Sequence, residues 1–226
     1  MYRNLIGLFF LLLLPSVVFA DPCTTSSQTG DVCEVQIANL FPTQFNVGLR
    51  EVNERAQKFQ AMSAQKLQAY IAANPALVVI GPGGRVYCTD KQHLAHALQD
   101  IGVTSMLGSV QGNLANLSEL DFLQGMKSNA WVYLYNLGKG PLDFAQLPKS
   151  IAAMGDDPFR SLAWYVRGQG GYTKSTAVAY ADFQWADFFR TRIALGSTDA
   201  EFNKAVDLAV VLAHSKSAQD LPGWSP

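Results

Sequence analysis

The sequence lacks an excess of charge of either sign. Its 17 lysine and arginine residues are balanced by 18 aspartate and glutamate residues, which gives a formal net charge of −1 at pH 7. Long-range attraction of nucleic acid depends on a strongly positive surface, so this composition gives no argument for it. A basic groove of local extent is compatible with the balance.

Long hydrophobic runs are also missing, except at the N-terminus. Residues 1–20, MYRNLIGLFFLLLLPSVVFA, combine a positive charge at Arg3, an apolar stretch over residues 5–14 and a terminal Val-Phe-Ala. A membrane-spanning helix needs roughly 20 apolar residues, whereas this three-part pattern is typical of a secretory signal peptide. We expect cleavage after Ala20 and a mature chain that begins at Asp21, has no membrane span and is secreted or periplasmic. An uncleaved anchor is the alternative.

Cysteine is scarce, with three residues in the chain. In an oxidising compartment the expected disulfide joins Cys23 to Cys33 and closes the loop CTTSSQTGDVC. A loop this short would add about 2–3 kcal/mol to the free energy of unfolding. Cys88 lies at an inward position of a predicted strand, so we expect a buried and unreactive thiol.

Two kinds of motif that would identify a reaction are missing. No Gly-Lys-Ser/Thr follows the glycine-rich stretch at 81–84 and no helix begins directly after it, so this stretch is predicted to be a hairpin turn rather than a phosphate loop. Two of the three histidines, His93 and His96, are three residues apart with no third ligand indicated, which is not a metal-binding motif. The cofactor is therefore left open, with a divalent metal as one candidate.

Strand and turn patterns dominate up to about residue 140, and helical patterns follow. Strands are expected at 33–41, 77–80, 85–88, 103–110 and 131–136, and helices at 47–73, 89–98, 117–126, 156–168, 177–195 and 199–218. This order indicates an α+β or α/β core with a helical C-terminal part. We expect a disulfide loop over 21–34, the α/β core over 35–140 and the helical part over 141–226, packed on that core.

The stretch TDKQHLAHAL, residues 89–98, is predicted to form a helix with a defined start. Thr89 and Gln92 fit the capping-box pattern, which places Asp90 in the first turn, where its charge complements the positive helix end. The free N–H groups of a helix start can bind an anion, and Lys91 lies beside them. A phosphate or phosphodiester oxygen would fit there.

The two histidines of this predicted helix occupy different faces. The expected buried stripe consists of Leu94, Leu98 and Ile101. At about 100° per residue, His93 falls at the edge of that stripe and His96 falls nearly opposite it. We therefore expect His93 to border a site and His96 to be solvated. The alternative is that Asp90 is an ordinary acid at a helix start and His93 an edge histidine with satisfied hydrogen bonds.

A further candidate lies in the segment DDPFRSL. Asp156 or Asp157 can cap a helix that begins at Pro158, which puts Arg160 in the first turn. Helix electrostatics do not favour a cation at that position, so Arg160 is expected to have an anionic partner. That partner is either the phosphate of a ligand or, alternatively, Asp156 or Asp157.

The order of these motifs resembles a known family. A strand, Pro42-Thr43-Gln44, a helix, VVIGPGGRVY and TDKQHLAHAL follow one another as in the ParB-like nuclease family of the ParB/sulfiredoxin superfamily. DDPFRSLAWYVR, GGY and FQWADFFR resemble the C-terminal part of that family, so the resemblance covers approximately residues 35–224. It implies an α+β fold, with a small mixed β-sheet and helices plus a helical C-terminal part, and a phosphate-handling pocket at the Asp/His helix.

The resemblance also implies roles for individual residues. Asp90 and His93 match the family's motif, whereas Lys91 and Gln92 stand where the fuller motif has glycine or histidine. One hypothesis is an exported nuclease or phosphodiesterase that acts on nucleic acid or another phosphorylated ligand. In it His93 acts as general base or acid and Asp90 orients it or holds a metal, while Lys91 and Arg160 bind the phosphate. The alternative is a non-catalytic binding protein for a nucleotide, another phosphorylated ligand or a protein partner.

Overall fold

The computed structural model describes residues 20–175 and 177–226. Apart from Ala20, the predicted signal peptide lies outside the described residues. Within them, five strands form a mixed sheet with the order β1-β6-β4-β5-β2. They are β1 (Val32–Gln36), β2 (Leu40–Pro42), β4 (Ala76–Ile80), β5 (Val86–Cys88) and β6 (Ser105–Asn113). β1 with β6 and β4 with β5 pair antiparallel, while β4 with β6 and β2 with β5 pair parallel, so the predicted α+β fold with a mixed sheet is confirmed.

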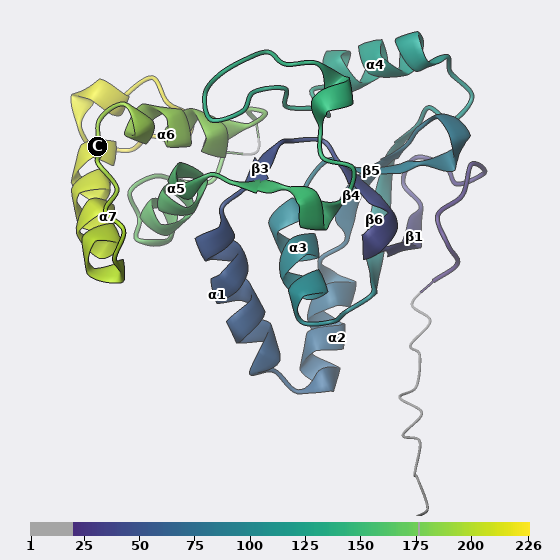
Figure 1. Ribbon diagram of the computed structural model, residues 1–226, viewed down its shortest axis with the longest axis horizontal. Coiled ribbons are helices and arrows are strands. Elements are labelled where there is room, and N and C mark those ends of the chain that lie inside the picture. Colours follow the sequence, from purple (N-terminus) through teal and green to yellow (C-terminus); the bar gives the residue numbers. More distant parts are fainter. Residues whose placement is uncertain (1–19, 176) are drawn as a thin grey trace, which may run out of the picture.

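Seven α-helices belong to the described part of the chain (Figure 1). They are α1 (Leu49–Gln60), α2 (Ala64–Ala73), α3 (Gln92–Asp100), α4 (Glu119–Ser128), α5 (Pro158–Gly168), α6 (Ala181–Arg190) and α7 (Asp199–Ala213). Short 3-10 helices are η1 (Ile37–Asn39), η2 (Pro82–Gly84), η3 (Phe144–Gln146), η4 (Ile151–Ala153) and η5 (Lys216–Ala218), and β3 (Asn46–Val47) pairs with β7 (Gly155–Asp156). None of these helices has both the length and the hydropathy that crossing a membrane requires.

Helices cover both faces of the sheet because its central strand is apolar on both sides. In β4, Val78 and Ile80 belong to the core cluster that contains residues of α1, α2 and α3. Val79 belongs to a second cluster, with Phe122 and Met126 of α4. Successive residues of a strand face opposite sides, so a continuous apolar run needs a cover on each side.

The hairpin predicted around 81–84 is confirmed, since β4 and β5 pair antiparallel across the turn of η2. The prediction of one helix over 47–73 was wrong, because α1 and α2 are separate. Ser63 separates them: it is the N-cap of α2, and its hydroxyl accepts a hydrogen bond from Lys66 N–H at 3.3 Å. Serine is a favoured N-cap. The apolar spacing continues across the break, since Phe59 and Leu67 both reach the same core, and this continuity hid the break.

The predicted strand at 131–136 was also wrong, since the chain there forms no ladder. Val132 and Leu134 are buried in the cluster with α4, so the alternation of apolar residues did indicate which side chains point inward. The backbone makes single hydrogen bonds instead, such as that from Tyr133 N–H to Thr43 O at 2.8 Å. The alternation of apolar residues predicts which side chains are buried, but a β-strand also needs a neighbouring strand with which it forms a continuous hydrogen-bond ladder.

The helices α5, α6 and α7 gather at one end of the molecule around their own apolar cluster, in which Leu162, Trp185 and Phe189 are fully buried (Figure 1). This cluster joins the rest of the protein where α5 meets α1. A Cβ at Gly48, just before α1, would lie 2.5 Å from Ser161 Oγ and 2.6 Å from Ser161 N. Glycine at this position therefore lets the starts of α1 and α5 approach closely.

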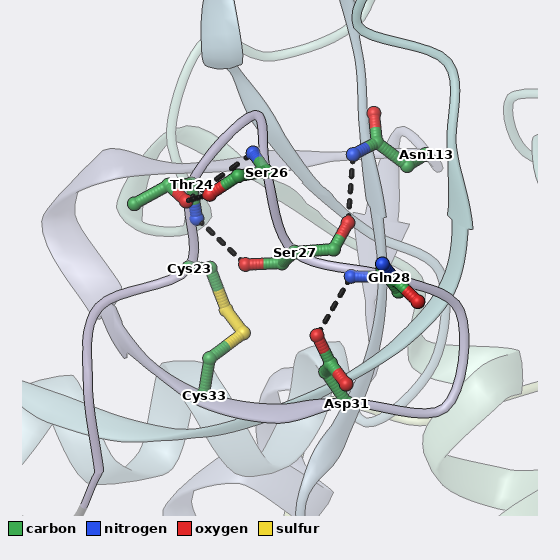
Figure 2. Close-up of a disulfide and its surroundings, with 8 residues drawn as sticks. All are labelled: Cys23, Thr24, Ser26, Ser27, Gln28, Asp31, Cys33 and Asn113. Atoms are coloured by element: carbon green, nitrogen blue, oxygen red, sulfur yellow. Dashed lines mark hydrogen bonds between the residues drawn. A yellow bond between two sulfur atoms is a disulfide. The ribbon is translucent and has the colours of Figure 1, made fainter.

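The Cys23–Cys33 disulfide is present, with its two Cα atoms 5.0 Å apart. Figure 2 shows the loop that it closes and the polar contacts within it. Asn113, at the end of β6, fixes this loop to the sheet because its Nδ2 donates to Ser27 O at 2.7 Å. Cys88 is free and buried, as expected.

Candidate functional site

The start of α3 differs from the prediction. The helix begins at Gln92, with Lys91 as N-cap in the left-handed region at φ 63°, and no side chain caps it. The predicted capping box is wrong because the sheet holds Thr89, whose N–H donates to Leu77 O at 2.9 Å. Asp90 therefore lies outside the first turn. Its carboxylate is exposed and accepts a hydrogen bond from Lys91 N–H at 2.7 Å.

His96 is buried, contrary to the prediction that it is solvated. The residue is 8 % exposed, and its Nδ1 lies 3.3 Å from Asp100 Oδ2. The prediction assumed that the helix has one buried face. In the structure α3 packs against α1 and also against η4, so most of its circumference is covered.

His93 lies at the border between core and solvent, as the sequence predicted, with 12 % of its side chain exposed. Its Nε2 accepts a hydrogen bond from Gly48 N–H at 2.9 Å. Because Nε2 is an acceptor, the proton of the neutral ring is on Nδ1. Burial, together with the positive charges of Arg160 and Arg55, holds the pKa of His93 well below its usual value. The ring is therefore neutral at pH 7.

Glu51, in the first turn of α1, faces the same ring nitrogen. Its Oε2 lies 3.5 Å from His93 Nε2, and its Oε1 accepts from Arg55 Nη2 at 2.7 Å. Burial raises the pKa of Glu51, and the charge of Arg55 opposes that effect. In the sequence Glu51 is an acid at a helix start, which gives no signal of a contact with residue 93.

Arg160 is buried in the first turn of α5, with 7 % of the residue exposed. Its Nε has no hydrogen-bond partner among the described residues. Its Nη1 lies 3.9 Å from Asp182 Oδ2, and the guanidinium carbon lies 4.2 Å above the centre of the Phe183 ring. Arg160 thus has a carboxylate nearby and a donor that remains free.

The ion pair of Arg160 with Asp156 or Asp157, the alternative raised by the sequence, does not form. Asp157 caps α5 and pairs with Arg190 at 2.7 Å. Asp156 accepts a hydrogen bond from Leu49 N–H at 2.8 Å. The carboxylate near Arg160 comes instead from α6, a tertiary contact that local sequence patterns do not reveal.

Asp182 is shared between several groups. It forms an ion pair with Arg167 and lies 3.3 Å from the hydroxyl of Tyr172, which donates to it. Burial alone would raise the pKa of Asp182, but the charges of Arg160 and Arg167 outweigh burial and lower it. Asp182 is therefore ionised, and its charge is largely neutralised by Arg167.

The predicted residues Asp90, Lys91, His93 and Arg160 line one cavity of about 390 Å³, which we call the Arg160 pocket. Its lining also includes Gln44, Gln92, Gln111, Lys174, Tyr180, Asp182 and Phe183. The structure thus brings a loop before α3 together with the starts of α5 and α6. Three cationic side chains and two carboxylates line it, and a pocket with this excess can bind an anionic group.

A metal site is not apparent in this pocket. Within residues 20–175 and 177–226, no group of three or more histidine, cysteine, aspartate or glutamate side chains lies close enough to hold a metal ion. The pocket's carboxylates are also engaged, Asp90 with a backbone N–H and Asp182 with an arginine.

Comparison with known proteins places the chain in a family. The model of the family described as "Putative ParB-like nuclease" matches residues 33–191, and the protein belongs to this family. The crystal structure of protein Atu1540 from Agrobacterium tumefaciens is similar, with a TM-score of 0.78 and 33 % sequence identity over 86 % of this chain and 96 % of that one.

A truncated chromosome-partitioning protein ParB from Caulobacter crescentus, in complex with CTP-gamma-S, also matches. Its TM-score is 0.28 at 14 % identity, over 84 % of this chain and 95 % of that one. No curated protein matches the chain.

Proposed function

We propose that the protein is an exported phosphodiesterase or nuclease whose active site is the Arg160 pocket. One observation carries this proposal. Arg160 of α5 and the Asp90-to-His93 segment at the start of α3 come from distant parts of the chain and line one cavity. There the Nε of the buried guanidinium has no hydrogen-bond partner among the described residues. The three cations that line this cavity outnumber its two carboxylates, and the phosphate of a substrate would balance that excess.

The cations of the pocket would bind the phosphate. A guanidinium offers several N–H donors in a planar fork that matches phosphate oxygens, so Arg160 would fix the reacting group. Lys91 lines the same cavity and adds a point charge at the α3 end. Asp90 also lines the cavity, and its exposed carboxylate is bound to Lys91 N–H. It would therefore orient a water or a leaving group and would not orient His93.

His93 would transfer the proton. General base catalysis requires an unprotonated Nδ1, and therefore the tautomer opposite to the one that Gly48 N–H stabilises. To reach it, the ring would have to exchange the hydrogen bond from Gly48 N–H for one from Nε2–H to Glu51. The Glu51 carboxylate, 3.5 Å from Nε2, can accept a hydrogen bond from that proton. It would also stabilise the imidazolium that forms when Nδ1 takes up a proton from the attacking water, as a carboxylate does in other histidine-dependent hydrolases.

A non-catalytic binding protein is the second candidate, and one observation favours it. The hydrogen bond from Gly48 N–H to His93 Nε2 stabilises the tautomer in which Nδ1 carries the proton. In that form His93 donates a hydrogen bond and does not accept a proton. The pocket would then hold a phosphorylated ligand without cleaving it.

A cleavage assay tests the two candidates. The mature protein is incubated with single-stranded and duplex DNA, with RNA and with a generic aryl phosphodiester, each with and without Mg²⁺ or Mn²⁺. Turnover of at least one substrate is the expected result. Binding of phosphorylated ligands without turnover would favour the binding protein, and neither binding nor turnover would contradict both.

Export can be tested separately, since it rests on the pattern of the first twenty residues and on the occurrence of disulfides in oxidising compartments. N-terminal sequencing of the protein from its native host should find Asp21 as the first residue. An intact Met1 in a cytoplasmic fraction would contradict export.

A further inference from the structure

A second cavity adjoins the Arg160 pocket, and we call it the Trp164 cleft. It has a volume of about 690 Å³ and is lined by residues of α1, of α5 and of the segment that follows α5. Its charged lining residues are Glu54, Lys58, Arg167 and Lys174. The cleft therefore has three cations and one carboxylate, an excess of positive charge like that of the Arg160 pocket.

Trp164 lines this cleft and lies outside the apolar core. The other three of the chain's four tryptophans lie in or against core clusters, whereas Trp164 belongs to none of the three clusters formed by the described residues. The residue is partly exposed, and Lys58 Nζ and the guanidinium carbon of Arg55 each lie 5.6 Å from the centre of its ring. Partly exposed aromatic rings among cations are typical of surfaces that bind single-stranded nucleic acid, because bases stack on the ring and phosphates pair with the cations.

The cleft and the Arg160 pocket are close enough for one ligand to occupy both. Lys174 lines both cavities, and the ion pair between Arg167 of the cleft and Asp182 of the pocket lies where they meet. Arg160 and Trp164 are one helical turn apart on α5, about 6 Å along its axis. They lie on the same side of the helix, about 40° apart at 100° per residue. A stacked strand advances about 3.4 Å per nucleotide, so about two nucleotides cover this length.

On the basis of the proposed function, we infer that the substrate is a single-stranded nucleic acid and that one of its bases stacks on Trp164. The reacting phosphate lies in the Arg160 pocket, the strand passes Lys174, and a base one or two nucleotides away enters the cleft. A duplex does not bind in this way, because its bases are already stacked on one another. Stacking uses the face of the base and not the sugar, so DNA and RNA single strands are both accepted.

Two substitutions of Trp164 test the stacking. Leucine retains an apolar side chain but has no ring, whereas tyrosine can still stack. Binding of DNA and RNA single strands of one sequence is measured by fluorescence anisotropy, in the cold and without divalent metal. Trp164→Leu should weaken the binding of both about 5- to 150-fold, the usual contribution of one base stacked on an aromatic side chain. Trp164→Tyr should retain most of the affinity.

Inorganic phosphate and a duplex of the same sequence are the ligand controls. Trp164→Leu should bind inorganic phosphate as tightly as the unaltered protein does, because phosphate needs the Arg160 pocket alone. Its affinity for the duplex should also be unchanged. Trp131→Leu is the matched protein control, since Trp131 is also partly exposed but lines neither cavity. It should bind single strands normally, and circular dichroism checks that all variants are folded.

Photochemical cross-linking locates the base without any substitution. A single strand that carries 5-iodouracil is bound to the unaltered protein and irradiated, and the cross-linked peptide is identified by mass spectrometry. Cross-links should occur at Trp164 or at Tyr165, which also lines the cleft. Cross-links confined to residues outside the cleft would contradict the inference.

The contrary outcomes separate this inference from the proposed function. If Trp164→Leu binds single strands as tightly as the unaltered protein, or no more weakly than Trp131→Leu does, the inference is overturned and the proposed function is unaffected. An equal loss of duplex binding or of phosphate binding in Trp164→Leu would also overturn it, because the effect would then not come from a stacked base. Binding of inorganic phosphate without binding of any single strand would have the same meaning. Binding of neither would overturn the proposed function as well.

Discussion

The protein has a larger cavity than the Arg160 pocket, and the two differ in how their charges are paired. The larger one, about 810 Å³, lies between α1, α5 and α7, and we call it the Arg50 pocket. Its lining includes Arg50, Glu54, Asp156, Tyr165, Asp199 and Phe202. Arg50 pairs with Asp199 at 2.6 Å, and Glu54 accepts a hydrogen bond from the Tyr165 hydroxyl.

In this comparison, the pairing of charges and the volume favour different cavities. The charged groups of the Arg50 pocket already have partners within the protein, so a ligand would have to displace them. The Arg160 pocket is half the size, and its three cationic side chains outnumber its two carboxylates. An anionic ligand would balance this excess of positive charge without displacing a partner of every cation.

The largest expected effect is on turnover, and it separates the two histidines of α3. His93→Ala should lower turnover by about 10²–10⁴-fold, the usual contribution of a general acid or base. His96→Asn should leave turnover near the unaltered level, because His96 does not line the Arg160 pocket. The measurement is the rate of cleavage of the best substrate, per folded molecule. Equal losses in the two variants would contradict the assignment of proton transfer to His93 and not to His96.

The next effect is on binding and compares an arginine from each pocket. Arg160→Met should weaken the binding of inorganic phosphate or an oligonucleotide at least about tenfold, since hydrogen bonds to charged groups contribute about 1.5–3 kcal/mol. Arg50→Met should leave binding unchanged. Isothermal titration calorimetry at constant ionic strength measures both. If Arg50→Met had the larger effect, the Arg50 pocket would be the binding site.

The folding stability of these two variants is the control for the binding experiment. After Arg160→Met, Asp182 keeps its ion pair with Arg167 and the hydrogen bond from Tyr172, so it does not become an isolated buried charge. Arg50→Met removes an ion pair whose arginine side chain is 37 % exposed, and exposed pairs contribute about 0–1 kcal/mol. We expect both variants to be folded, as chemical denaturation would show.

The sequence predicted those parts of the fold that depend on short-range patterns. The β4–β5 hairpin was predictable because a Gly-Pro-Gly-Gly turn separates two apolar strands. The break at Ser63 and the irregular segment at 131–136 were not, because each preserves the apolar spacing of a continuous element. Spacing identifies which residues are buried more reliably than it identifies the backbone conformation.

The residues of the candidate site also fall into those that the sequence predicted and those that it did not. Asp90 and His93 could be selected from the sequence because they match a motif. Lys91 could be selected because it lies beside a predicted helix start, and Arg160 because a cation is unusual in a first helical turn. Glu51 and Asp182 could not, because they reach the site through contacts between helices. His96 was wrongly predicted for the same reason, since α3 is covered by α1, η4 and η1 and not along one stripe alone.

The smallest expected effect is on the pH dependence of stability, and it concerns His93. Because the pKa of His93 is held well below its usual value, first by burial and then by Arg160, the unfolded chain takes up a proton near pH 6.5 while the folded protein does not. The unfolded state therefore binds more protons, and stability falls as the pH decreases below about 6.5, by at most about 1.4 kcal/mol per pH unit.

Urea unfolding at pH 7, 6 and 5 measures this loss, with His93→Gln as the comparison. Glutamine can still accept a hydrogen bond from Gly48 N–H, as His93 Nε2 does at 2.9 Å, but it does not titrate. The unaltered protein should lose more stability than His93→Gln between pH 7 and pH 5. Identical losses would mean that His93 becomes protonated in the folded protein as readily as in the unfolded chain, so that the Arg160 pocket does not keep the ring neutral.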